Sequence, residues 1–231
     1  MKRFYITLSA VLAVASFYAQ SDADISQDKA VFKQAMIYAD ADVAINALYD
    51  IIAKEGDNSI YKDSLAYLYF SGRKYSSCFM VCADILSKDN KKQNILEMQA
   101  ISLENMGAID KAAQAYAKLT IMTNNNYHAY KLGNLYFALK KYDDAYKAVK
   151  KALELEDKGT IQVNYRVNQN YTQQVALLAA IYNLKGLIEF EQEKNDLAKL
   201  SFQKAVDLQD DFVLAKENLQ AVIDGKKVKK E

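Results

Sequence analysis

The sequence contains no proline and no tryptophan, a single histidine and only two cysteines. His128 has no cysteine or carboxylate partner at the spacing of metal ligands, so we expect a surface histidine and no metal site. Cys78 and Cys82 lie four residues apart, which is not the spacing of thiol–disulfide enzymes. They are expected to pack as small apolar side chains. These shortages argue against metal-dependent and dithiol chemistry.

The sequence motifs of common enzyme classes are also missing. No glycine-rich nucleotide-binding or phosphate-binding loop occurs, and neither does GxSxG or HExxH. Acidic pairs such as Asp143 and Asp144 precede predicted helices, where carboxylates act as caps. We therefore expect a protein that is not an enzyme and has no cofactor.

The charges are balanced, with 30 basic and 29 acidic side chains. This balance gives no electrostatic reason to expect binding to nucleic acid or to anionic membranes. Hydrophobic residues make up 51% of the 231 residues, which is enough to bury a continuous core.

The N-terminus has the pattern of a secretion signal. Lys2 and Arg3 precede an apolar stretch from Phe4 to about Ala15, which is too short for a comfortable membrane span. We predict a signal peptide over residues 1–19, with cleavage near Ala19; Ala13 and Ala15 offer another site. No cysteine follows the stretch, so a lipid anchor is not expected. The mature protein is predicted to be periplasmic or secreted, without stable membrane insertion.

A pattern of small residues repeats along the rest of the chain. The small residues that begin the pattern are Ala66, Ala100, Gly133 and Gly186. Twelve residues after each come Cys78, Ala112, Ala145 and Ala198. Sixteen residues after each come Cys82, Tyr116, Val149 and Phe202. Such a period indicates stacked helical hairpins, each of which covers the apolar face of the previous one.

The chain resembles the tetratricopeptide repeat family. In the clearest unit, Leu132, Gly133 and Tyr136 match the family's first helix, and Ala145 and Ala152 match its second. A further unit keeps Tyr182, Gly186, Ala198, Phe202 and Ala205, but has Glu189 where the family has tyrosine. The family's proline is missing, and four polar residues stand in its place: Asn90, Asn124, Asp157 and Asp210.

The resemblance implies an all-α fold, a right-handed solenoid of about five helical hairpins over residues 20–224. The repeats are predicted near residues 25–58, 59–92, 93–125, 126–159 and 179–212, with a capping helix over 213–224. Residues 225–231 are expected to form a frayed basic tail.

An insertion over residues 160–178 interrupts the repeats. Ile161, Val163, Tyr165 and Val167 alternate with polar residues as in a strand, whereas Val175 to Leu178 could lengthen the next helix. The preferred interpretation is a longer helix with a surface loop. The alternative is that the insertion contributes to a binding face.

The resemblance also implies a concave groove lined by the first helices. The predicted groove residues are Tyr67, Phe70, Met98, Ile101, Tyr130, Lys131, Asn134, Phe137, Asn183, Leu187 and Phe190. This lining is more apolar than a soluble monomer usually exposes. A partner peptide or helix could cover it; equally, the insertion, the N-terminal leader or a second copy could fill it. The lysine and asparagine clamp by which some members of the family grip a terminal carboxylate is incomplete here.

We therefore expect an interaction scaffold or adaptor of a bacterial envelope, whose partner is either another protein or a second copy of itself. The alternative is a glycan or small-ligand binding protein on a helical repeat scaffold, against which the absence of tryptophan counts. A regulatory subunit of an enzyme would have the same sequence features.

Overall fold

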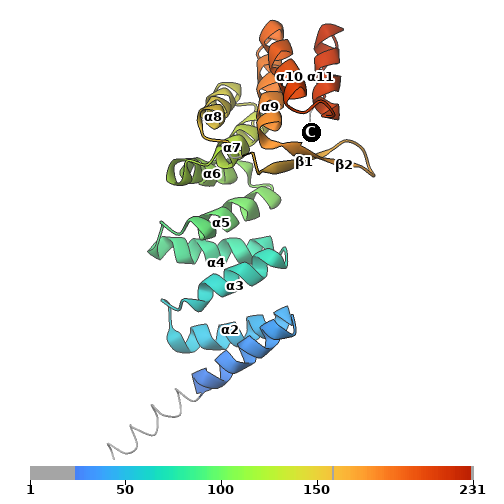
Figure 1. Cartoon of the computed structure of the whole chain (residues 1–231). Helices are drawn as coiled ribbons and strands as arrows, with labels where there is room; N and C mark the ends of the chain where they lie inside the picture. The colour runs from blue at the N-terminus through green and yellow to red at the C-terminus, as the bar shows by residue number, and fades with distance from the viewer. Residues whose placement is uncertain (1–23, 158, 230–231) are drawn as a thin grey trace, which may run out of the picture. The chain divides into compact units, whose positions relative to one another are not determined.

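The computed structural model describes residues 24–157 and 159–229 (Figure 1). The predicted signal peptide, residues 1–19, lies outside the described residues. The chain divides into two compact units, Met1–Ser102 and Leu103–Glu231. In both described ranges, every helix is too short or too polar to cross a bilayer.

The first unit consists of antiparallel helices. A helix over residues 24–37 is followed by the helices α2 (Ala41–Glu55), α3 (Tyr61–Ser71), α4 (Tyr75–Lys88) and the larger part of α5 (Gln93–Asn105). Apolar side chains from successive helices form one core, which includes Leu48, Ile51, Leu65, Ala66, Cys78, Cys82 and Ile95. The two cysteines are fully buried in this core and unoxidised, as the sequence predicted.

The second unit contains two complete helical pairs, α7 (Asn126–Ala138) with α8 (Tyr142–Glu154) and α9 (Leu177–Glu191) with α10 (Asn195–Leu208), together with α6 (Ile109–Thr123), α11 (Val213–Ile223) and a β-hairpin. The all-α class is thus confirmed, with one short sheet added. Gly133 and Gly186 lie where helices approach each other: an added Cβ would be 2.9 Å from Val149 and 2.6 Å from the Phe202 ring. The residues that the sequence pattern places sixteen positions apart therefore pack against each other within one helical pair.

The helical pairs of both units share one turn geometry. A residue in the left-handed conformation follows each first helix: Ala39, Arg73, Gly107, Lys140 and Glu193. The next N–H then donates to a carbonyl five residues earlier, as from Lys141 to Tyr136 at 2.9 Å. This is the hydrogen bond of a Schellman motif. Only one of the five turn residues is glycine, so glycine positions alone could not locate the turns.

The last helix ends in the same manner. Gly225 is in the left-handed conformation, and the N–H of Lys226 donates to Ala221 at 2.8 Å. Val228 is then 9% exposed and packs near Leu187 and Phe202, and the N–H of Lys229 donates to Asn218 at 2.7 Å. The expectation of a frayed tail is therefore wrong as far as residue 229.

Most of the insertion folds as a β-hairpin. Strand β1 (Gln162–Arg166) pairs antiparallel with β2 (Thr172–Ala176), with Val163 opposite Val175. Helix α9 begins at Leu177, so the predicted lengthening holds for Leu177 and Leu178 and is wrong for Val175 and Ala176, which belong to β2. The physical reason is the alternating pattern itself: it places Tyr165 and Val175 in the buried core of the unit, while Gln162 and Asn164 stay exposed.

Candidate functional site

The second unit contains a cavity of about 600 Å³ beside helix α7. One wall comes from α7, with Tyr127, Asn134 and Phe137, and from Tyr142, the first residue of α8. The opposite wall comes from α9, with Asn183, Leu184 and Leu187, and from β1, with residues 162–165. The insertion therefore builds one side of the candidate site.

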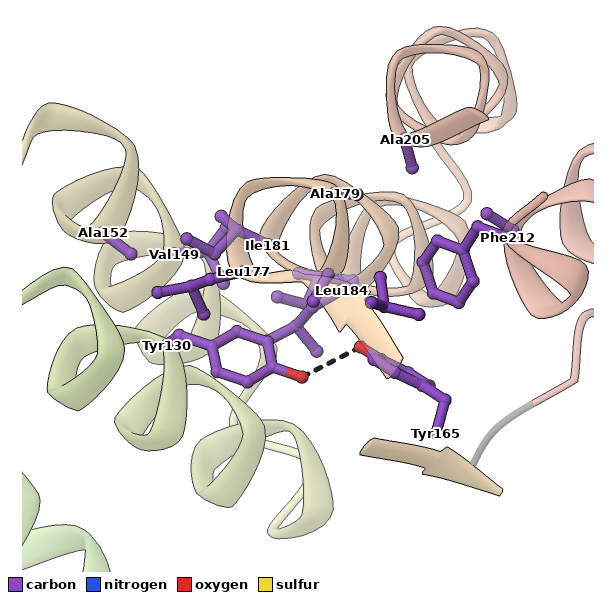
Figure 2. Close-up of a cluster of buried hydrophobic side chains, with 14 of the residues drawn as sticks. Tyr130, Val149, Ala152, Tyr165, Leu177, Ala179, Ile181, Leu184, Ala205 and Phe212 are labelled. Carbon is purple, nitrogen blue, oxygen red and sulfur yellow. Dashed lines mark hydrogen bonds between the residues drawn. The ribbon is translucent and has the colours of Figure 1, made fainter. Parts of the chain in front are cut away.

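The cavity lining includes two tyrosines from distant parts of the chain, Tyr130 and Tyr165. The hydroxyl groups of Tyr130 on α7 and Tyr165 on β1 are 2.8 Å apart and hydrogen-bonded (Figure 2). Each side chain is only 3% exposed. Tyr165 also packs edge-on against Phe212, at 4.9 Å between ring centroids. The insertion thus covers part of the predicted groove, which was one of the open alternatives.

This burial corrects the role expected for three of the predicted groove residues. Tyr130 is enclosed by the hairpin, and Asn183 and Leu187 are 0% and 4% exposed. Tyr130 is a structural contact in this fold and not an exposed anchor. Six of the predicted residues nevertheless line the cavity: Tyr130, Lys131, Asn134, Phe137, Asn183 and Leu187.

The other five predicted groove residues lie elsewhere. In the first unit, Tyr67 is 57% exposed, whereas Phe70 and Met98 pack against the core of that unit. Ile101 is half-buried on α5. Phe190, in the second unit, packs in the cluster that contains Val228 and Leu219 and is not among the residues that line the cavity. The sequence pattern therefore places these residues on first helices but does not bring them into one site.

One amide group in the cavity wall lacks a partner. Asn183 Oδ1 accepts a hydrogen bond from Asn218 Nδ2 at 3.4 Å, but Asn183 Nδ2 has no partner among the described residues. The whole side chain is buried. Because Nδ2 is itself buried from solvent, the unsatisfied amide belongs to the packing between α9 and α11 and is not presented to a ligand.

Two of the three charged residues that line the cavity form an ion pair with each other, and the third, Lys140, is exposed. Lys131 Nζ lies 2.6 Å from Glu104 Oε1, and 5.9 Å from the centre of the Tyr116 ring. The Tyr142 hydroxyl donates to Glu191 Oε2 at 2.7 Å, and this hydrogen bond to a carboxylate raises the pKa of Tyr142. The cavity therefore offers aromatic and amide groups more than free charge.

Twelve of the eighteen lining residues are not among the predicted groove residues, and they include Tyr142, Gln162 and Asn164. The strand-like alternation around Val163 was the signal that could have found the last two. The sequence analysis also predicted a surface position for His128, but this residue is only 5% exposed. His128 Nδ1 is hydrogen-bonded to Thr123 Oγ1 at 2.8 Å, so burial is compensated by a partner. Within the part of the chain that the structure describes, no group of side chains could hold a metal ion.

A comparison with models of protein families identifies two of the helical pairs. The tetratricopeptide repeat model matches residues 129–158 and 179–212. These are the two units that the sequence pattern marks most clearly, and their helices form consecutive packed hairpins. Residues 129–158 and 179–212 are thus tetratricopeptide repeats. No functionally curated protein matches the chain.

Several solved tetratricopeptide repeat structures share its fold. A MamA structure is 16% identical, with a TM-score of 0.63 over 80% of this chain and 92% of its own. MamA from Desulfovibrio magneticus RS-1, from residue 41 to its end, is 12% identical, with a TM-score of 0.61 over 82% and 97%. YrrB, described as having an unusual peptide-binding site, is 13% identical, with a TM-score of 0.64 over 80% and 86%. At these identities the likeness shows the fold alone.

The structure also explains how the repeat over residues 179–212 departs from the family at Glu189. The carboxylate is fully buried, lies 2.6 Å from Lys185 Nζ, and accepts a hydrogen bond from Ser201 Oγ on α10. Lys185 also donates to Ser201 at 2.9 Å. A buried polar network thus joins α9 to α10 where the family has an aromatic ring.

Proposed function

We propose that this protein is a non-catalytic interaction scaffold or adaptor that binds a peptide segment of a partner protein in the cavity of its second unit. The observation that carries the proposal is the cavity of about 600 Å³, whose lining combines the aromatic side chains of Tyr127, Phe137 and Tyr142 with the amide of Asn134 and the strand β1. The cavity volume also falls in the range of ligand sites, which is about 300 to 1,000 Å³.

The fold supports a peptide more than a small molecule. Tetratricopeptide repeats present successive helices along a concave surface, and YrrB, which shares the fold, is described as having a peptide-binding site. The aromatic residues Tyr127, Phe137 and Tyr142 offer apolar contact area with a polar end on the tyrosines. A peptide uses both kinds of contact, because it has side chains to bury and backbone groups to satisfy.

A random dodecapeptide library displayed on messenger RNA tests the proposal. The full chain, Asn134→Trp and Lys147→Trp are each immobilised and exposed to the library. Asn134 lines the cavity, whereas the Lys147 side chain is 78% exposed on α8 and serves as the matched control. Selected peptides should bind the wild type and Lys147→Trp equally, and bind Asn134→Trp about tenfold more weakly. Peptides that bind all three proteins equally would contradict the proposal.

A glycan array separates this proposal from the glycan-binding alternative. Amide and aromatic side chains could also hold a sugar, so the array is probed with the full chain and with Asn134→Trp. Saturable sugar binding that Asn134→Trp abolishes would favour the alternative.

We further propose that the protein acts in the bacterial cell envelope. The support is the sequence of residues 1–19, where two basic residues precede a short apolar stretch and small residues. The test fuses residues 1–24 to a reporter enzyme that is active only outside the cytoplasm, with Leu12→Arg as the control. Reporter activity that requires the apolar Leu12 is expected; an inactive fusion would contradict this localisation.

A further inference from the structure

One edge of the β-hairpin is unpaired. The N–H of Leu177 donates to Ile161 and the N–H of Val167 donates to Tyr171, each at 3.0 Å. In an antiparallel ladder the backbone groups of alternate residues face the partner strand. The odd-numbered residues of β1 therefore face β2, and the N–H and C=O groups of Gln162 and Asn164 point to the opposite edge. No hydrogen bond of these groups occurs within residues 24–157 and 159–229.

The outer edge of β2 differs from that of β1, because a side chain forms hydrogen bonds with its backbone. Gln209 Oε1 accepts a hydrogen bond from the N–H of Ala176 at 2.8 Å. Gln209 Nε2 donates to the carbonyl of Gln174 at 3.1 Å. One glutamine side chain thus takes the place of a neighbouring strand. The edge of β1 has no such cover among the described residues, so the two edges of this sheet are not equivalent.

The cavity runs along the open edge of β1. Four consecutive residues, Gln162 to Tyr165, line it. Successive side chains of a strand point to opposite faces, so a cavity against one face would be lined by alternate residues only. A lining of consecutive residues places the cavity beside the backbone edge.

We propose that the partner segment binds as an extended strand, which pairs with the free edge of β1 and adds a third strand to the sheet. This inference rests on the proposed function and specifies the conformation of the peptide. Pairing satisfies backbone groups of Gln162 and Asn164, as in other cases of strand addition. Alternate side chains of the peptide then point towards Phe137 and Tyr142, so the segment carries apolar residues at every second position.

Substitution of Asn164 tests the pairing from the side of the protein. Asn164→Pro removes an N–H that points away from β2, which an edge strand tolerates. Asn164→Ala removes the side chain and keeps the N–H, so it is the matched control. Peptides selected on the wild-type chain should bind Asn164→Pro about tenfold more weakly and bind Asn164→Ala with little change. Thermal unfolding of both variants checks that the hairpin unit remains folded.

N-methylated peptides test the pairing without any change to the protein. Each backbone amide of a selected peptide is methylated in turn, which removes one N–H donor. If the peptide is a strand on β1, methylation should weaken binding about tenfold at every second residue and leave the intervening residues almost unaffected.

The possible results are distinguishable. Alternating sensitivity together with loss in Asn164→Pro supports the inference. Peptides that depend on Asn134 but show no alternation, or bind Asn164→Pro normally, would overturn strand pairing and leave the proposed function intact. If no selected peptide binds Asn134→Trp more weakly than the wild type, both the proposed function and the strand pairing are contradicted. A dimer of the full chain, detected by sedimentation and abolished by Asn164→Pro, would show that a second copy and not a foreign peptide occupies the edge.

Discussion

The hydroxyl groups of Tyr130 and Tyr165 are hydrogen-bonded at 2.8 Å, and this contact joins helix α7 to the inserted hairpin. Both side chains are buried, so the bond forms where water does not compete. Tyr130 was expected to anchor a partner, yet in the fold it anchors the insertion. The hairpin is thereby held beside α7 as one wall of the cavity.

Removal of either hydroxyl group should weaken this attachment. Tyr130→Phe and Tyr165→Phe are each expected to lower the free energy of unfolding by about 1 kcal/mol, because each leaves a buried hydroxyl with one partner fewer. The double variant should cost less than the sum of the two, since both substitutions remove the same bond. Urea denaturation of the four proteins measures this coupling. Strict additivity would show that the two hydroxyls do not stabilise each other.

Gly186 should be intolerant of even a methyl group. A Cβ at this position would lie 2.6 Å from Phe202, whose ring is fully buried. Gly186→Ala is therefore expected to lower the free energy of unfolding by about 1 to 3 kcal/mol through overpacking, despite the better helix propensity of alanine. Phe202→Leu in the same chain should recover part of the loss. Thermal and urea unfolding provide the measurement, and an unchanged stability of Gly186→Ala would contradict this close approach.

The two Lys–carboxylate pairs of α8 and α9 should differ in their effect on stability. Glu189 is fully buried beside Lys185, whereas Asp144 and Lys147 are largely exposed. Lys185→Met should cost about 3 kcal/mol because it leaves a buried carboxylate without its counter-ion. Lys147→Met should cost less than about 1 kcal/mol. Equal losses in urea denaturation would contradict a structural role for the buried network.

The first unit should lose stability at high pH through Tyr69. Burial and the hydrogen bond to Tyr49, 2.8 Å away, raise the pKa of Tyr69 to about 12. The unfolded chain releases this proton at its lower pKa, near 10. The contribution is therefore complete below pH 10 and is lost as the pH rises towards 12, with a total of about 2 kcal/mol. Urea midpoints between pH 9 and 12 should fall less steeply in Tyr69→Phe; parallel curves would contradict the assignment.

The helical hairpins could be predicted because their signal is local. The small residue contacts its partner sixteen residues later within one helical hairpin, as Gly133 does with Val149. Because each hairpin needs such a contact, the same spacing of residue types repeats along the sequence. The turns left a weaker trace, since Lys140 and Glu193 adopt a left-handed conformation that favours glycine.

The site could be predicted only in part, because its remaining features depend on contacts between distant residues. The alternation around Tyr165 indicated a strand, but nothing in the sequence indicated that this strand would lie against Tyr130. His128 and Glu189 are buried with partners, Thr123 for the histidine and Lys185 for the carboxylate. A polar residue type suggests exposure, and only the fold shows which polar groups find a partner inside.

The central claim is that the cavity of the second unit receives a segment of another protein, and photo-crosslinking in living cells tests it most directly. A photoreactive amino acid is placed at Asn134 in the cavity, or at Lys147 on the exposed face of α8 as the control. We predict that one protein is crosslinked at position 134 and not at position 147, and that mass spectrometry maps the crosslink to an extended segment of that protein. Identical products from both positions, or crosslinks only to further copies of this chain, would contradict the account.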